Sequence, residues 1–307
     1  MKRFISYVII AVAMAATVTS CVDEEEFDDS PTGNFEALWK IIDEHYCFFD
    51  YKKQEYGLDW DDVYAKYRVR ISDNMTSDQL FEVMADMLSE LRDGHVNLSR
   101  AADFARYWSW KEDYPSNFSD TLQRRYLGTD YQIASGITYR VLDDNIGYIY
   151  YESFSDAIGE GNLDEAINRL MLCNGLIIDI RNNGGGNLTN AEKLAARFTN
   201  EAVHVGYICH KTGPGHNDFS EKEEQWIEPS SNMRWQKKVC VLTNKSVYSA
   251  ANEFVKYMAC MPSVTIVATA PAAGPACRST TRCPTGGQCA SRPALCTTPR
   301  AIQPSLA

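Results

Sequence analysis

The sequence predicts an α/β fold with a small helical subdomain on its N-terminal side. From about Gly136 to Val267, strand-like and helix-like segments alternate along the chain, which favours a largely parallel sheet. Before Leu98 the patterns are helical instead. A chain of 307 residues can bury a sizeable core, as one large domain or two modest ones.

Three helical patterns predict the N-terminal subdomain, which we place at residues 33–98. In the third, Thr76 stands where an N-cap is expected, and Leu, Val and Met recur on one face. The predicted helices are Phe35–Phe49, Asp59–Ile71 and Ser77–Leu91.

The α/β domain is placed at residues 99–267, with residues 99–135 and 211–236 expected to be rich in loops. The stretch "ITYRVLDDNIGYIYYESF" predicts two strands around an Asp-Asp-Asn turn. The further predicted elements are helix Asn162–Leu172, strand Gly175–Ile180, helix Leu188–Phe198, strands His204–Cys209 and Lys238–Thr243, helix Ala250–Met261 and strand Val264–Val267.

The first 21 residues have the pattern of an export signal: a basic start, an apolar run and small residues before Cys21. With "VTSC" as a lipobox, the segment resembles a bacterial lipoprotein signal peptide. The resemblance implies lipidation of Cys21, a polar acidic linker at residues 22–32, and an envelope location with a membrane anchor, on the periplasmic or the surface face. An ordinary secretory signal is the alternative.

Charge argues against a nucleic-acid partner. The net charge is −11, and all 41 acidic residues precede residue 268. Such a body would repel phosphate backbones, and no basic groove with interleaved aromatic residues is evident. The cysteines before the tail form no CxxC pair and the histidines no HExxH motif. We therefore predict no metal site and no cofactor, and read these cysteines as small core residues.

The glycine-rich segment "DIRNNGGGN" lies between a buried-type strand and a helix. Its three glycines allow positive φ and a close backbone approach, so that N–H groups can point at an anion. It matches neither a Walker loop nor a GxGxxG fingerprint. Taken alone, it fits a tight structural turn as well as an oxyanion hole.

The segment "VLTNKSVYSAANEF" places Ser249 at the start of a helix. There the helix dipole and unused N–H groups would stabilise negative charge on an acyl intermediate. On pattern alone the reading of Ser249 as an N-cap is favoured, because serine is a preferred cap. Ser246 is a second candidate in the same loop.

A third segment, "LRDGHV", places His95 between a helix and a short strand. The three segments together resemble, in order and rough spacing, the motifs of the S41 peptidases, the family of tail-specific (C-terminal processing) proteases and tricorn protease. The resemblance covers roughly residues 33–267. It implies a ClpP/crotonase-like α/β domain beside a helical N-terminal part.

The resemblance also implies roles for individual residues. Ser249 matches the nucleophile, and the N–H of Ala250 with one from Gly184 or Gly185 would form the oxyanion hole. His95 matches the histidine of tricorn-like members, which acts as general base. Tail-specific proteases use a lysine instead, and Gly274 occupies its position here, so a Ser/His mechanism is favoured.

Composition changes abruptly at Ala268. The segment from there to residue 307 contains no acidic residue and no Lys, Phe, Tyr or Trp. Where many S41 proteins continue with Gly-Asp-Arg-Thr-Gly-Gly-Gly, this chain reads "ATAPAAG", and a one-base shift in the coding DNA permits either reading. We therefore predict that residues 268–307 are an out-of-frame, disordered tail with accidental cysteine spacing; a genuine Pro/Ala/Cys-rich tail is the alternative.

These observations predict a lipid-anchored serine endopeptidase that acts on peptides or proteins through an acyl-enzyme. The tail would replace the rest of the sheet and, by analogy with tricorn, an acidic residue of the catalytic relay, so the chain as written is expected to be impaired or inactive. A non-catalytic peptide-binding lipoprotein of the same fold is the alternative.

Overall fold

The computed structural model describes residues 28–107, 109, 115–268 and 295–296. It divides into two compact units with a boundary between Arg106 and Tyr107, and Pro214–His216 groups with the first unit. We call the first the helical unit and the second the sheet unit. The predictions for the signal peptide, Cys21, most of the linker and most of the tail lie outside the described residues. No helix among the described residues is long and apolar enough to cross a membrane.

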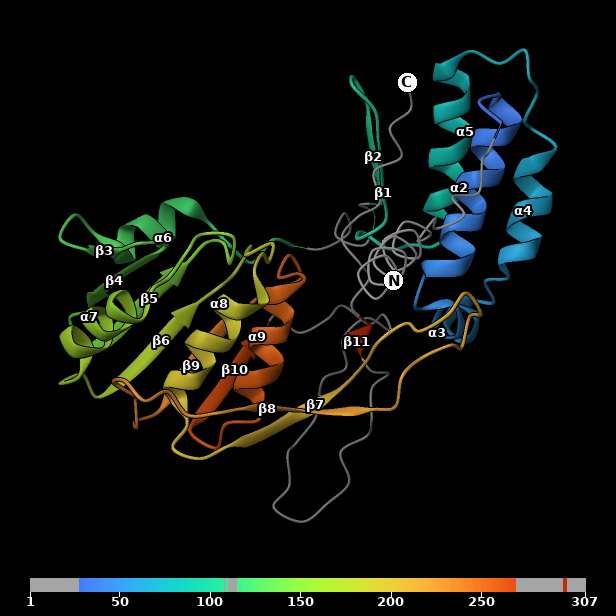
Figure 1. Ribbon diagram of the computed structural model, residues 1–307. Coiled ribbons are helices and arrows are strands. Elements are labelled where there is room, and N and C mark those ends of the chain that lie inside the picture. Colours follow the sequence, from blue (N-terminus) through green and yellow to red (C-terminus); the bar gives the residue numbers. More distant parts are fainter. Residues whose placement is uncertain (1–27, 108, 110–114, 269–294, 297–307) are drawn as a thin grey trace, which may run out of the picture. The chain divides into compact units, whose positions relative to one another are not determined.

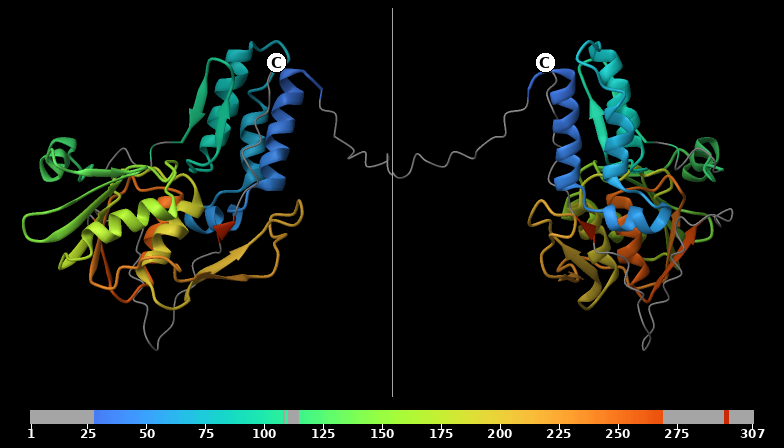
Figure 2. Two further views of the ribbon diagram at one scale, coloured as in Figure 1. Left: turned by 60° about the vertical axis from the view of Figure 1, so that its left-hand side comes forward. Right: turned by 90° about the vertical axis from the view of Figure 1, so that its right-hand side faces the viewer.

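The helical unit is built from helices and one small hairpin. Figures 1 and 2 show three of the helices packed side by side. Their apolar faces form one core, in which Phe35, Met87 and Leu91 are fully buried. The elements are α2 (Pro31–His45), α3 (Phe49–Tyr56), α4 (Trp60–Arg68), α5 (Ser77–Ser89), β1 (Asn97–Ser99) and β2 (Phe104–Arg106).

Local sequence explains where these helices begin. The Ser30 side chain accepts a hydrogen bond from the Gly33 N–H, and Pro31 occupies the first turn, so α2 starts within the segment predicted as linker. Thr76 caps α5 through a capping box with Gln79, as its position predicted. The predicted helix Phe35–Phe49 is wrong at its end, because Tyr46 is already extended (φ −73°, ψ 127°).

The sheet unit is centred on a six-stranded sheet in the order β10-β9-β6-β5-β4-β3. Strands β5, β6, β9 and β10 are parallel, and β4 and β3 continue the sheet antiparallel. The strands are β3 (Gln132–Ala134), β4 (Ile137–Val141), β5 (Ile146–Tyr151), β6 (Gly175–Asp179), β9 (Val239–Thr243) and β10 (Val264–Ala268). The prediction of an α/β fold with a largely parallel sheet is confirmed.

Helices α7 (Glu160–Leu170), α8 (Leu188–Ala195) and α9 (Ala250–Ala259) cover one face of this sheet, as Figure 1 shows. Each connects two neighbouring parallel strands in the same direction along the sheet, and right-handed crossovers then place all three on one side. Their buried residues join those of the strands in a single core, which includes Ile149, Ile178, Val241 and Phe254.

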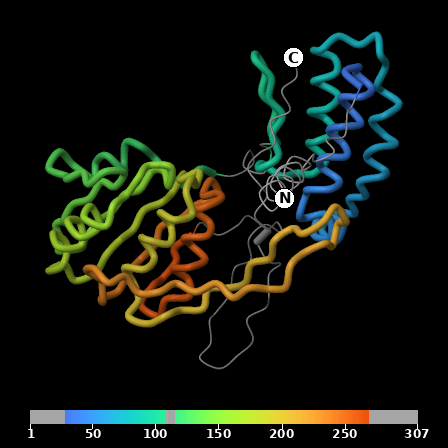
Figure 3. The backbone as a smooth tube through the Cα atoms, viewed as in Figure 1, coloured from blue at the N-terminus to red at the C-terminus, as the bar shows by residue number. Residues whose placement is uncertain are grey.

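Three further strands form a separate small sheet, β11-β7-β8. Strand β7 (Val203–Cys209) pairs with β8 (Glu223–Ile227) as a long hairpin, which Figure 3 traces in gold and orange, and β11 (Leu295–Cys296) pairs parallel with β7. Short helix η2 (Ala196–Phe198) extends α8, and α6 (Asp120–Leu127) precedes β3. Both α6 and β8 lie in segments that the sequence left without a pattern.

Candidate active site

The parallel pairing of β6 with β9 brings two predicted motifs to the same edge of the sheet. Asp179 at the end of β6 is in register with Leu242 of β9, and the Ile180 N–H donates to the Leu242 carbonyl at 3.1 Å. The segments after these two strands therefore begin side by side, at the carboxyl ends where α/β proteins place their ligands. One is the glycine-rich turn, residues 181–186; the other is the serine loop, residues 244–249.

Ser249 is the last residue before α9 and has an unusual backbone. Its φ is +53° and its ψ −125°, a conformation that non-glycine residues rarely adopt. Its side chain makes no capping hydrogen bond to the helix. A strained serine between a strand and a helix is the arrangement that presents the hydroxyl of a nucleophile. The geometry thus does not match the simple N-cap reading of Ser249.

Gly185 is the residue of the glycine-rich turn that lies against Ser249. A Cβ added at Gly185 would stand 2.7 Å from the Ser249 Cβ and 2.9 Å from the Ala250 nitrogen. The φ of Gly185 is +91°, which also favours glycine. This close approach requires a residue without a side chain, and it places the turn next to the serine. Ser246 lies within the tight turn closed by the Val247 N–H bond to the Asn244 carbonyl.

The backbone N–H groups of the glycine-rich turn and of the first residue of α9 differ in whether they donate a hydrogen bond. The Gly185 N–H donates to Asn183 Oδ1 at 2.9 Å. Among the described residues, neither the Gly184 N–H nor the Ala250 N–H donates a hydrogen bond to another residue. Ala250 is fully buried at the N-terminus of α9, where the helix dipole favours negative charge. Gly184 and Ala250 therefore each have a backbone N–H that is not bonded to another described residue.

Asn183, which the sequence did not single out, holds the turn in place. It is fully buried, and its Nδ2 donates to the Tyr151 carbonyl at 2.8 Å while its Oδ1 accepts from Gly185. Its carbonyl accepts the Tyr248 N–H at 3.1 Å, which ties the turn to the serine loop. Asn182 and Asn244 add a second tie through paired amide contacts of 3.0 and 2.7 Å.

A buried ion pair supports the start of the same turn. Asp179 is fully buried. Arg181 donates two hydrogen bonds to its carboxylate, from Nε at 2.9 Å and from Nη2 at 2.6 Å. The Tyr148 hydroxyl donates to Asp179 Oδ2 at 2.8 Å. The Asp179 carboxylate raises the pKa of Arg181, and burial together with Asp179 raises the pKa of Tyr148. Arg181 and Tyr148 therefore both stay protonated and keep their hydrogen bonds to Asp179. These bonds stabilise the start of the turn.

His95 lies in the helical unit, on the loop between α5 and β1. Its side chain is half exposed, and its Nδ1 is 3.2 Å from Asp93 Oδ1. The Tyr46 hydroxyl donates to the other oxygen of Asp93 at 2.9 Å. The structure thus brings Ser249, Ala250, Gly184 and Gly185 together in the sheet unit, and His95 together with Asp93 in the helical unit.

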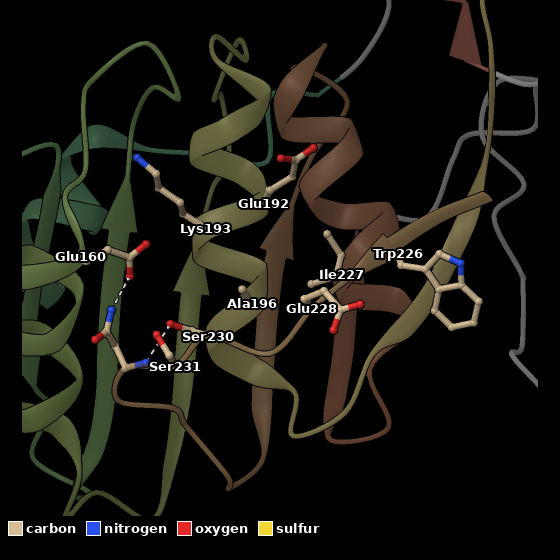
Figure 4. Close-up of a pocket in the computed structure, with 10 residues that line it drawn as sticks. Glu160, Glu192, Lys193, Ala196, Trp226, Ile227, Glu228, Ser230 and Ser231 are labelled. Carbon is tan, nitrogen blue, oxygen red and sulfur yellow. Dashed lines mark hydrogen bonds between the residues drawn. The ribbon is translucent and has the colours of Figure 1, made fainter. Parts of the chain in front are cut away.

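A shallow cavity of about 480 Å³ lies elsewhere on the sheet unit (Figure 4). It is lined by residues of α7, α8 and β8, among them Glu160, Glu192 and Trp226, and by none of the predicted site residues. The predicted site thus rests on motif geometry and backbone contacts. Among the described residues, no group of His, Cys, Asp or Glu is arranged to hold a metal ion.

Two family models match this chain. Residues 145–301, just over half of the chain, match the model of peptidase family S41. Residues 27–89 match the model of the tricorn protease C1 domain. None of the curated proteins matches the chain significantly.

Solved structures of peptidases are also similar to this chain. A candidate peptidase from Parabacteroides merdae is 48% identical, covers 78% of this chain and 75% of its own, and has a TM-score of 0.73. Mature CPAF is 12% identical and covers 77% of this chain and 82% of its own, with a TM-score of 0.56, which indicates a shared fold. The expected S41-type fold with a helical N-terminal region is confirmed. The chain belongs to peptidase family S41.

Proposed function

We propose that this protein is a serine endopeptidase in which Ser249 is the nucleophile and His95 the general base. The observation that carries the proposal is the backbone of Ser249, strained at φ +53°, without a capping bond and in contact with Gly185. Membership of a peptidase family supports peptides or proteins as substrates. The serine type follows from the family, and the residue roles are our assignment.

In the proposed reaction, His95 Nε2 takes the proton of the Ser249 hydroxyl while Oγ attacks the carbonyl carbon of the substrate. The resulting oxyanion accepts hydrogen bonds from the N–H groups of Gly184 and Ala250. Gly184 is preferred to Gly185, because the Gly185 N–H is already bound to Asn183. His95 then gives its proton to the leaving amine, the C–N bond breaks, and water hydrolyses the acyl-enzyme.

One experiment separates this proposal from two alternatives, Ser246 as the nucleophile and a non-catalytic peptide-binding lipoprotein. A fluorophosphonate probe, which reacts with activated serines, and hydrolysis of a mixed peptide library are measured on the wild type, Ser249→Ala and Ser246→Ala. We expect Ser249→Ala to lose both signals and Ser246→Ala to keep them. Loss in Ser246→Ala alone would make Ser246 the nucleophile. A folded wild type that binds peptides without labelling or hydrolysis would favour the non-catalytic peptide-binding lipoprotein.

If the tail is out of frame, as the sequence predicts, the chain as written is expected to be impaired or inactive in this experiment. Only Ala268 and residues 295–296 of that segment are described. Re-reading the coding DNA across codons 255–307 tests it directly. If an additional base restores Gly-Asp-Arg-Thr-Gly-Gly-Gly, the peptidase proposal applies to the corrected protein, and both forms are assayed side by side. If no frame gives that motif, the out-of-frame hypothesis is wrong.

We also propose attachment to the cell envelope through a lipid on Cys21. The support is the sequence of residues 1–21, with a basic start, an apolar run and "VTSC". Fractionation of cells that produce the wild type or Cys21→Ala tests this proposal. The wild type should sediment with membranes and Cys21→Ala should not; equal behaviour of the two would contradict lipidation. We propose no nucleic-acid partner, in keeping with the acidic charge.

A further inference from the structure

The loop that carries His95 is held by three hydrogen-bond donors from one distant segment. The Tyr56 hydroxyl donates to the Glu90 carbonyl at 2.9 Å, and Lys52 Nζ donates to the Arg92 carbonyl at 3.0 Å. The Tyr46 hydroxyl donates to Asp93 Oδ2 at 2.9 Å. Lys52 is buried, with 9% of its surface exposed. A buried ammonium and two phenols that converge on one short loop indicate that its conformation is tightly specified.

Asp93 uses its two oxygens for different partners. Oδ2 accepts the Tyr46 hydroxyl, whereas Oδ1 accepts the backbone N–H of His95 at 2.9 Å and faces His95 Nδ1 at 3.2 Å. The Asp93 side chain is 12% exposed and that of His95 53%. Because an ionised carboxylate can only accept hydrogen bonds, this contact places the imidazole proton on Nδ1 and leaves the lone pair on Nε2.

The surroundings favour the ionised form of Asp93. Burial opposes ionisation, but the hydrogen bonds from His95 and Tyr46 outweigh it, so the pKa of Asp93 lies below its ordinary value. Lys52 of α3 interacts electrostatically with Asp93, with Arg92 of the loop itself and with Glu55 of α3. Lys52 attracts the Asp93 carboxylate, although burial lowers the pKa of Lys52. Asp93 is thus anionic at neutral pH.

We infer that Asp93 is a positioning residue for His95: its carboxylate fixes the imidazole proton on Nδ1 and stabilises the imidazolium that forms when Nε2 takes a proton. The inference rests on the proposed role of His95 in peptide hydrolysis. Asp93 acts through His95 and touches no substrate. Tyr46 and Lys52 act one step further back, by holding the carboxylate and the loop. An acidic residue beside the base is what a serine nucleophile and a histidine base require.

Nuclear magnetic resonance on the full chain tests the inference without relying on activity. The ¹⁵N shifts of His95, assigned by comparison with His95→Gln, should show a protonated Nδ1 and an unprotonated Nε2 in the neutral ring of the wild type at alkaline pH. In Asp93→Asn this preference for the tautomer protonated on Nδ1 should weaken, because the carboxylate that accepts the Nδ1 proton is gone. Asp86→Asn is the control: its carboxylate is exposed and paired with Arg70 in the same unit.

The opposite tautomer in the wild type, or the same tautomer preference in the wild type and in folded Asp93→Asn, would overturn the inference. The tautomer measurement decides the matter even if Asp93→Asn does not fold. With peptide substrate, kcat of Asp93→Asn should fall on the order of a hundredfold or more with KM little changed. A wild type without hydrolysis, but with the expected tautomer and its weakening in Asp93→Asn, would refute the proposed function alone.

Discussion

The serine loop and the histidine loop are held in place by different kinds of interaction. Around Ser249 the backbone itself sets the geometry, through the ends of two paired strands and a glycine in contact with the serine. Around His95 the side chains of Tyr46, just after α2, and of Lys52 in α3 bind the loop by hydrogen bonds. We therefore expect the geometry of Ser249 to be disturbed by side-chain atoms added to the turn. The geometry of His95 should be disturbed by the loss of hydrogen bonds in its loop.

The largest effect is expected from Gly185→Ala. The added Cβ would meet the Tyr248 carbonyl oxygen at 2.5 Å and the Ser249 Cβ at 2.7 Å, at a φ of +91°. We expect the rate of probe labelling to fall at least ~100-fold, because the turn must move away from the serine, and unfolding to become easier by about 1–3 kcal/mol. Labelling kinetics and thermal denaturation measure the two effects.

Gly161→Ala is the matched control for this substitution. Gly161 lies in α7 with no other atom within 4 Å of an added Cβ. Alanine there should leave labelling unchanged and stabilise the unit by about 0.5–1 kcal/mol. If Gly185→Ala labels as fast as Gly161→Ala, the contact between turn and serine has no role in reactivity.

Asn183→Ala should have the next largest effect. It removes the acceptor of the Gly185 N–H and the donor to the Tyr151 carbonyl, and leaves buried polar groups unpaired. We expect a loss of about 3 kcal/mol in the free energy of unfolding. Chemical denaturation measures it, with exposed Asn168→Ala on α7 as control, expected within ~0.5 kcal/mol of the wild type. Similar stabilities for the two variants would mean that Asn183 does not hold the turn.

Tyr46→Phe should have the smallest effect, and one that depends on pH. It deletes a single hydroxyl that donates to Asp93, at a cost of about 1–2 kcal/mol near neutral pH. The pKa of Asp93 is lowered in the folded state. Its contribution to stability is therefore present above the unfolded pKa of about 3.9 and lost as pH falls through the folded value. The difference between Tyr46→Phe and wild type should shrink on acidification below about pH 4.

Denaturation curves at several pH values measure this effect. Tyr126→Phe is the control, since Tyr126 is 63% exposed and its hydroxyl bonds to no other described residue. We expect no pH-dependent difference for that variant. A Tyr46→Phe difference that stays constant down to pH 2.5 would contradict the assigned contact with Asp93.

The sequence predicted those elements whose apolar residues follow a clear period. Helix α5 buries Leu80, Met84 and Met87 on one face, and its cap at Thr76 follows the expected rule. Helix α3 was missed because only Phe49 and Lys52 of its residues are buried, and strand β8 because "EEQWI" is largely exposed. The structure of such polar surface segments depends on contacts with other elements, and an apolar period in the sequence does not reveal those contacts.

The site was predictable to a similar extent. The position of Ser249 before a helix and the glycines of the turn could be read from local patterns, whereas the positive φ of Ser249 could not. Asp93 was visible beside His95, but not its distance from the ring. Tyr46 and Lys52 are 47 and 40 residues away from the groups that they contact. Only the packing of α2 and α3 against the loop brings them there.

One measurement tests the central claim that Ser249 and His95 act together. The rate of fluorophosphonate labelling is followed in the wild type, His95→Gln and the control His45→Gln, and the modified residue is located by mass spectrometry. His45 is half-buried within α2, with its ring nitrogen on the Ile41 carbonyl. The account predicts an adduct on Ser249, at least ~100-fold slower labelling in His95→Gln and an unchanged rate in His45→Gln. An adduct on another residue, or equal rates in all three proteins, would contradict it.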